Sequence, residues 1–403
     1  MAEIPAVFDG GIDFDPQQNL ETLLKNVPAK WAVCLYRGEA DTPLQLLSVK
    51  NLRASLRRRL GEPDAAIEPS KRVDYRQIVR RIDWRRVDSD FEANWIYHDL
   101  FRRTFPDFPP ELSGFRPAWW ICVNPAAEFP RYVKTTELTS KESWYFGPIV
   151  DKHLAARLIE TVEDAFDLCR YYHILLQAPN GRACAYKEMG KCPAPCDGSI
   201  TMPQYRRMIE WSANTLTHPE PFIREQEYRM HQAAGDLRFE SARKIKTFIE
   251  QISKFRKGPL ASITRLDELA FVAIQPGPGT RKAKVFLILP GQIEEIAGLI
   301  DRPRTMSELM RLILTEADQK IRTRTLDAHG AGRMAVVAHH LTGAAKDAAQ
   351  FLPLAEISEA AIERAIAALA KRKTPEIVVG AEEEGIVKEA GPMRGDGIGG
   401  API

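Results

Sequence analysis

The sequence predicts an α+β protein with several domains, and three observations carry this prediction. With 403 residues the chain is longer than one ordinary domain, so two or three domains are expected. Short apolar runs with strand-like spacing occur in turn with longer segments that have helical spacing. Hydrophobic residues make up 44% and charged residues 27%, which is typical of a globular protein.

The predicted elements divide the chain into four folded regions and a tail. The regions are a small sheet with helices at 26–110, a segment with a strand pair, a helix and four cysteines at 111–200, a helical hairpin at 201–256, and an α+β region without an assigned role at 259–375. Residues 1–25 are expected to be a loose arm, and the Gly-rich residues 376–403 a disordered tail.

The first region begins with two short strands. Apolar residues fill 31–38 and 44–49, and a polar turn separates the two runs. A basic helix is expected at 50–61. Helical spacing returns at 91–105, where Asp90 is a suitable N-cap and prolines close the segment.

The second and third regions are mainly helical after an initial strand pair. Strands are expected at 117–123 and 129–135, and a helix at 151–170. A long helical pattern at 202–255 is broken at Gly235–Asp236, which predicts a helical hairpin.

The last region starts with a β-hairpin signal at 269–291, where two apolar runs surround a Pro/Gly turn. Helices are expected to follow at 305–321, 332–341 and 358–372.

Positive charge gathers in the first region, although the net charge of the whole chain is only +2. A basic stretch of this kind suits contact with nucleic-acid phosphates. A solvated helix face explains the same charges equally well. The stretch consists of Lys50, Arg53, Arg57, Arg58, Arg59, Lys71, Arg72, Arg76, Arg80, Arg81, Arg85 and Arg86.

Location is predicted from the N-terminus and the cysteines. The first residues are acidic and lack the apolar core of a signal peptide, and no run of about 20 apolar residues predicts a membrane span. We therefore expect a cytoplasmic protein with no membrane partner. In that reducing compartment six cysteines do not indicate disulfides, and Cys34 and Cys122 are expected to be buried structural thiols.

The other four cysteines, Cys169, Cys184, Cys192 and Cys196, have the order C-x14-C-x7-C-x3-C. Four thiolates in one short stretch favour zinc or an iron–sulfur cluster. Structural zinc usually recruits tight pairs, which only the last two cysteines form, so spacing alone leaves both metals open. Four unconnected buried thiols are the remaining interpretation.

The sequence around these cysteines resembles the UvrC family, the nuclease component of excinuclease ABC. The matching motifs are Tyr145-Phe146-Gly147-Pro148, Cys169, Arg182-Ala183-Cys184 and the run from Gly190 to Gly198 (GKCPAPCDG). The resemblance implies a 4Fe–4S cluster on the four cysteines, with zinc as the alternative.

A second motif of the same family lies at 235–245, which resembles the UVR motif (GDLRFESARKI). In UvrC this helical hairpin contacts UvrB, so the resemblance implies a UvrB-like helicase subunit as partner. Packing of the hairpin against this chain's own domains is the alternative. The residues expected to bind the partner are Leu237, Phe239, Glu240, Ala242, Arg243 and Ile245.

Residues 26–110 resemble a GIY-YIG nuclease domain, with Lys50–Arg53 (KNLR) fixing the register. That domain needs two tyrosines, an arginine and a metal-binding glutamate. At these positions the chain has Cys34, Gln45, Ser55 and Tyr97, and Leu47 replaces a glycine. The domain is therefore expected to be degenerate, unless Asp99, Glu92, or Tyr36 with Arg57 substitute after a shift in register.

The C-terminal region departs from the family. UvrC continues with an RNase H-like nuclease domain and helix-hairpin-helix motifs, but after Gly258 neither a paired set of aspartates nor the helix-hairpin-helix glycines are found. His339 and His340 lie in an apolar helix and are expected to have a core or surface role.

The resemblance covers roughly 26–256 and implies a non-catalytic protein of nucleotide excision repair that binds DNA and a UvrB-like partner. Two alternatives stay open: an active endonuclease with a rearranged site, and an interaction module outside repair. The expected DNA-binding residues are Lys50, Arg53, Arg57, Arg58 and Arg59.

Overall fold

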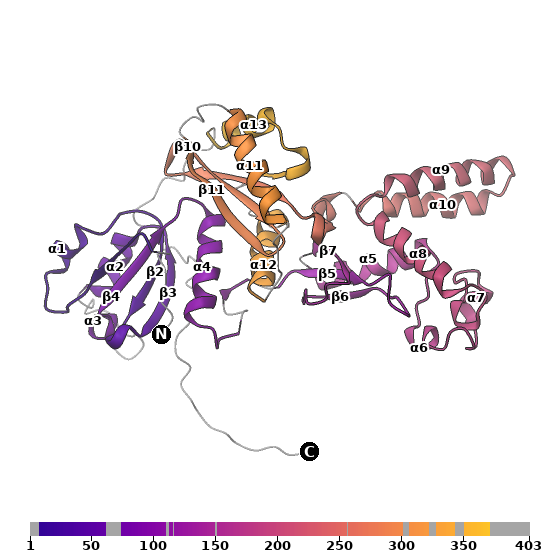
Figure 1. Ribbon diagram of the computed structural model, residues 1–403, viewed down its shortest axis with the longest axis horizontal. Helices are drawn as coiled ribbons and strands as arrows, with labels where there is room; N and C mark the ends of the chain where they lie inside the picture. Colours follow the sequence, from indigo (N-terminus) through magenta and orange to yellow (C-terminus); the bar gives the residue numbers. More distant parts are fainter. Residues whose placement is uncertain are drawn as a thin grey trace, which may run out of the picture.

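The computed structural model describes residues 8–61, 74–109, 113–115, 117–149, 151–255, 257–300, 306–321, 328–342 and 350–370. Within them the chain forms an α+β structure with three four-stranded sheets, which confirms the predicted fold class (Figure 1). None of the described helices is long and apolar enough to cross a membrane. The predicted disordered tail at 376–403 lies outside the described residues.

The first sheet is antiparallel and has the order β1-β4-β2-β3. Its strands are β1 (Gly10–Asp13), β2 (Ala32–Arg37), β3 (Pro43–Val49) and β4 (Arg81–Arg86). The central strand β2 is buried along its whole length because a helix covers each face of the sheet. These helices are α2 (Leu52–Leu60), capped by Asn51, and α4 (Asp90–Thr104), capped by Ser89.

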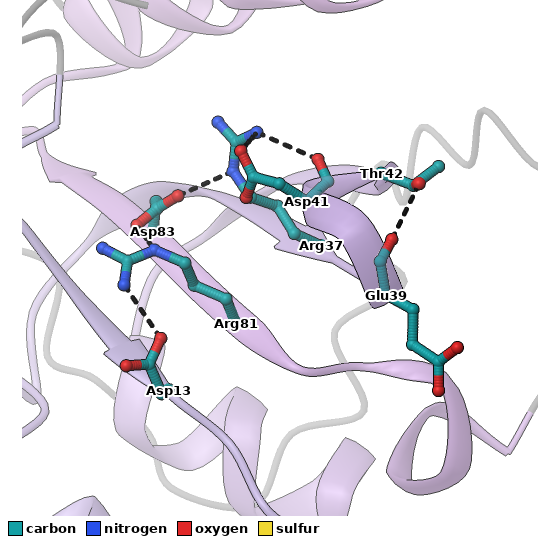
Figure 2. Close-up of polar contacts among 7 residues, drawn as sticks. All are labelled: Asp13, Arg37, Glu39, Asp41, Thr42, Arg81 and Asp83. Atoms are coloured by element: carbon teal, nitrogen blue, oxygen red, sulfur yellow. Dashed lines mark hydrogen bonds and ion pairs between the residues drawn. The ribbon is translucent and has the colours of Figure 1, made fainter.

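The expected loose arm at 1–25 is wrong for the residues that the structure describes there. Strand β1 pairs with β4, and the short helix α1 (Leu20–Leu24) packs on α2. Ion pairs hold this arrangement. Asp83 on β4 accepts from Arg37 Nε at 2.7 Å and from Arg81 Nε at 2.8 Å, and Arg81 also reaches Asp13 at 2.8 Å (Figure 2).

The second sheet has the order β6-β5-β7-β8. Strands β5 (Trp119–Val123) and β6 (Val133–Thr135) form the predicted pair, and β7 (Trp144–Ile149) lies on the other side of β5. The fourth strand, β8 (Thr264–Arg265), comes from beyond the helical hairpin and pairs with β7 at Phe146 and Gly147.

Helices α5 (Lys152–Ala165) and α8 (Met202–Thr215) share one large core with this sheet. Two four-residue helices, α6 (Tyr172–Leu175) and α7 (Ala185–Glu188), lie between them in the chain. The predicted hairpin is formed by α9 (Glu220–Gly235) and α10 (Phe239–Ile252) and projects from one end of the molecule (Figure 1).

The third sheet has the order β11-β10-β9-β12 and is also antiparallel. It extends the predicted β-hairpin of β9 and β10 by two strands. Helix α12 packs against α4, so this unit adjoins the first one (Figure 1). The elements are β9 (Phe271–Gly277), β10 (Gly279–Leu289), β11 (Gln292–Ile300), α11 (Met306–Ile321), α12 (Ala328–Thr342), β12 (Gln350–Pro353) and α13 (Glu359–Ala370).

Short helical turns complete the described chain. They are α3 (Tyr75–Ile78) and the 3-10 turns η1 (Glu39–Asp41), η4 (Pro195–Asp197), η5 (Gly258–Leu260), η6 (Leu266–Glu268) and η8 (Leu354–Glu356).

Candidate functional site

Three of the four residues predicted to be degenerate nuclease positions come together beneath α2. Cys34 on β2 belongs to the core under this helix, and Gln45 on β3 pairs with Tyr36, two residues beyond Cys34. Ser55 on α2 is buried and lies close enough to Tyr36 to affect its ionisation. Tyr97 is different, because it packs with α4 on the opposite face of the sheet. The structure therefore separates Tyr97 from the other three.

Polar atoms under α2 are buried without hydrogen-bond partners among the residues that the structure describes. They are Tyr36 Oη, Gln45 Oε1, Ser55 Oγ and Arg59 Nε. Arg59 lies one helical turn beyond Ser55, with its guanidinium carbon 5.7 Å from the centre of the Tyr75 ring. We call these four residues, with Cys34, the relic cluster. Sequence reasoning assigned Arg59 to the DNA-binding face, although its i+4 spacing from Ser55 could have placed it here.

The relic cluster holds its ionisable groups neutral. Burial raises the pKa of the Cys34 thiol to about 12 and that of the Tyr36 hydroxyl well above its usual value. The positive charge of Arg59 opposes both shifts but does not outweigh burial. No carboxylate is among the described groups that shift these two pKa values.

The acidic residues considered as substitutes for the metal ligand are engaged elsewhere. Glu92 on α4, of which only 1% of the side chain is exposed, accepts from Lys284 Nζ at 2.8 and 3.0 Å. It also accepts from the backbone N–H of Asp88 at 2.9 Å, and burial raises its pKa. Asp99 is bound by Arg333 at 2.9 Å. Both carboxylates thus join α4 to the third unit.

The predicted DNA-binding residues differ in whether their charged groups are already bonded to other groups of the protein. Arg53 donates through Nε to the carbonyl oxygen of Val27 at 2.8 Å. Arg57 forms a two-pronged ion pair with Glu21 at 2.6 and 2.8 Å, which also lowers the pKa of Glu21.

The remaining cations of this face are exposed or turned inward. Lys50 and Arg58 are exposed, and Lys50 Nζ lies 5.8 Å from the Trp31 ring centre. Arg59 belongs to the relic cluster. Of the five predicted residues, Lys50 and Arg58 therefore have the charges most available to a phosphate.

Among the other described residues of the basic stretch, Arg81, Arg85 and Arg86 are paired with acids, whereas Lys71 and Arg72 lie outside the described residues. Besides the Asp83 and Asp13 contacts of Arg81 (Figure 2), Arg85 lies 3.7 Å from Glu295 and Arg86 lies 3.5 Å from Asp9. These arginines join strands through ion pairs, so their charges are less available to a phosphate than those of Lys50 and Arg58.

The cysteine quartet does not form the predicted metal centre. Cys169, Cys192 and Cys196 are buried, whereas Cys184 is half-exposed at the start of α7. A hydrogen bond between Cys169 and Cys192 raises the pKa of Cys169 and lowers that of Cys192 to about 7. Among the described residues no group of three or more His, Cys, Asp or Glu side chains could hold a metal ion. This finding overturns the predicted 4Fe–4S cluster and the zinc alternative.

The tip of the helical hairpin is exposed and apolar. Leu237, which has a φ of +58° in the turn, is 74% exposed, and Phe239 at the start of α10 is 65% exposed. Glu240 and Arg243 are exposed as well. Ala242 and Ile245 are partly covered between the two helices. The interpretation in which this chain's own domains cover the hairpin does not hold for the tip.

Comparison with known proteins places these features in a family context. The family model of the UvrC/Cho excinuclease middle domain matches residues 118–215, which include the second sheet's first three strands and helices α5 to α8. No solved structure matches the chain.

Curated relatives match over a longer span. UvrABC system protein C of Clostridium botulinum (strain 657 / Type Ba4) is 26% identical over 278 residues, 68% of this chain and 44% of that protein. UvrABC system protein C of Syntrophomonas wolfei is 25% identical over 277 residues, 68% of this chain and 45% of that protein. The chain thus matches less than half the length of these relatives.

Proposed function

The chain belongs to the UvrC family, and from this membership we propose that it acts in nucleotide excision repair without cutting DNA itself. The single observation that carries the proposal is the relic cluster. At the positions where the resemblance leads us to expect catalytic groups, this chain has the buried, neutral side chains of Cys34, Gln45 and Ser55. In this proposal the protein binds DNA and a UvrB-like helicase subunit.

The ion pairs of α4 support the absence of cleavage. Phosphodiester hydrolysis by this type of fold needs a divalent cation held by a carboxylate. Glu92 and Asp99 are the nearest substitutes along the helix, and each is bound by a cation of the third unit, Lys284 or Arg333. Recruiting either carboxylate would require breaking its ion pair.

A cleavage assay tests this part of the proposal. The purified chain would be incubated with nicked or lesion-bearing duplex DNA, Mg²⁺ or Mn²⁺ and a UvrB-like helicase subunit. We expect no incision. Metal-dependent cuts that disappear in the Tyr36→Phe or Asp99→Asn variant would instead identify an active endonuclease with a rearranged site.

DNA binding would use the exposed cations beside α2. Lys50 and Arg58 are exposed, whereas Arg53 and Arg57 have partners within the protein and Arg59 is directed into the relic cluster. A phosphate contact is lost steeply as salt rises, so each removed contact lowers the slope of log affinity against log salt by about 1. We expect Arg58→Ala to lower both the affinity for duplex DNA and this slope. The control is Arg103→Ala on α4, an exposed position away from α2.

The exposed hairpin tip supports binding of a UvrB-like partner. An apolar side chain at the centre of an interface often costs 2 kcal/mol or more when it is truncated. We therefore expect Phe239→Ala to weaken binding of a UvrB-like helicase subunit by at least about 30-fold, while Lys254→Ala at the base of the hairpin leaves it unchanged. Calorimetry measures both, and equal affinities would contradict the assignment.

A further inference from the structure

A second surface rich in rings and cations lies at the end of the molecule opposite to α2 (Figure 1). It is formed by the segment from Cys169 to Cys192, which contains α6 and α7, together with Arg131 from the loop before β6. The charges of this segment are mostly positive. Four basic residues, Arg170, Arg182, Lys187 and Lys191, accompany a single acid, Glu188.

Three tyrosines of this segment and two arginines make edge-to-face and cation–ring contacts. Tyr171 is 42% exposed and meets Tyr186 edge to face at a ring separation of 5.7 Å. The guanidinium carbon of Arg170 lies 5.4 Å from the Tyr186 ring centre. Next to Tyr171 in the chain, Tyr172 lies under Arg131 at 3.9 Å. We call these five residues the tyrosine–arginine surface.

Two cations here keep their charge available. Arg131 and Arg182 are exposed, and neither forms an ion pair with any residue that the structure describes. Two of the adjacent acids are occupied. Asp164 pairs with Arg170, and Asp197 accepts from Lys187 Nζ at 2.6 Å, which contributes to lowering the pKa of Asp197 to about 2. A negatively charged partner would therefore meet uncompensated positive charge.

We propose that the tyrosine–arginine surface binds single-stranded nucleic acid. Exposed rings stack on unpaired bases, while nearby cations contact the backbone, and this combination is sequence-tolerant. Single strands suit it better than duplex, because a stacked duplex does not present its base faces to a ring such as Tyr171. The helices α6 and α7 have four residues each, too short to fill a major groove.

The apolar border of the surface fits the same occupant. Leu176 and Met189, at the C-terminal ends of α6 and α7, are 47% and 57% exposed. A protein partner would also cover such side chains, but the excess of cations over acids in this segment favours a polyanion. The inference rests on the proposed function in one respect, since it adds a second DNA contact to the one beside α2.

Fluorescence anisotropy of the full chain with a fluorescein-labelled oligothymidine of about 20 nucleotides, longer than one single-strand site, tests the proposal. We expect Tyr171→Ala to weaken binding by about 5- to 150-fold, because one base stack contributes roughly 1–3 kcal/mol. Tyr171→Phe should retain most of the affinity. Arg131→Ala should weaken binding and lower its salt dependence. Tyr228→Ala, which removes an exposed ring from α9, is the matched control and should have no effect.

The outcomes distinguish this surface from the proposed contact beside α2. Loss of oligothymidine binding in Tyr171→Ala and Arg131→Ala, with duplex binding still sensitive to Arg58→Ala, supports the proposal. Unchanged oligothymidine binding in both variants overturns it, whether or not Arg58→Ala weakens duplex binding. Sensitivity to Arg58→Ala alone would assign all DNA contact to α2, and so would also overturn it.

Discussion

The ion pair between Lys284 and Glu92 predicts a large, pH-dependent loss of stability when the lysine is removed. The Lys284 side chain is 12% exposed and that of Glu92 only 1%, and the ammonium group also reaches Asp88 at 2.8 Å. Lys284→Met keeps most of the side-chain volume but leaves two carboxylates without their cation.

The expected magnitude follows from the burial of the pair. Removing one partner of a buried ion pair typically costs about 3–5 kcal/mol, because the remaining charge is left uncompensated. Glu92 limits this cost by taking up a proton. Burial already raises its pKa, and loss of the opposing charge of Lys284 raises it further.

The sign of the pH dependence follows from this raised pKa. Between the unfolded and folded pKa values of Glu92 the folded state binds more protons, so stability increases as pH falls. We expect the deficit of Lys284→Met to be about 3–5 kcal/mol near pH 8 and to shrink by up to about 1.4 kcal/mol per pH unit on acidification. Lys254→Met, at an exposed site, should change stability by less than about 0.5 kcal/mol.

Hydrogen exchange measured by mass spectrometry suits this test, because a chain of several domains has no single free energy of unfolding. Peptides from α4 and β10 report the opening free energy at this contact, and α9 peptides serve as the internal reference. Equal exchange of α4 in the wild type and Lys284→Met at pH 8 would refute the reasoning. So would a deficit that stays constant down to pH 5.

Three further predictions concern buried groups. Tyr36→Phe should raise the opening free energy of β2 by about 1 kcal/mol in hydrogen exchange, because it removes a buried hydroxyl that has no hydrogen-bond partner among the described residues. A loss of similar size would show that the hydroxyl is satisfied. Gly332→Ala should destabilise the protein by about 1–3 kcal/mol in thermal unfolding, because the added methyl group would overlap the His98 ring. Gly235→Ala is the control, because a methyl group there meets no neighbouring atom. Equal melting temperatures of the two variants would contradict this prediction. Stability should decrease as the pH is lowered from 6.5 to about 4. Burial lowers the pKa of His98 to about 4 and that of His340 to about 3, so the unfolded state binds more protons in this range. His340→Gln should flatten the plot of stability against pH, and an unchanged plot would exclude this cause.

Periodicity predicted most helices but missed strands whose polarity depends on distant partners. The segment Arg81–Arg86 (RIDWRR) has four charged residues, so its sequence does not resemble a central strand. In the structure Ile82 and Trp84 face the core, and the charge of Asp83 is balanced by Arg37. A strand of this kind is recognised only after its partners are known, because ion pairs 46 residues apart leave no local pattern.

In the candidate site, too, local sequence predicted some features, and contacts between distant residues determined the others. The structure places Cys34, Gln45 and Ser55 under α2, and their assignment as degenerate nuclease positions stays a prediction. The role of Arg59 depended on which face of α2 is covered, which the sequence alone leaves open. The metal centre failed for a related reason, since cysteine spacing along the chain does not determine whether the thiols converge in space.

The return of the chain at β8 makes the hairpin arm inseparable from the sheet below it. The polypeptide leaves this sheet at Ile149 and comes back at Thr264, directly beside the strand it left. The segment between these two residues, which includes α9 and α10, is therefore a long insertion that begins and ends at neighbouring strands of one sheet. A protein truncated after residue 256 would lose β8, the edge strand that pairs with β7. Force applied to the hairpin tip would act on β8 and, through its pairing, on β7.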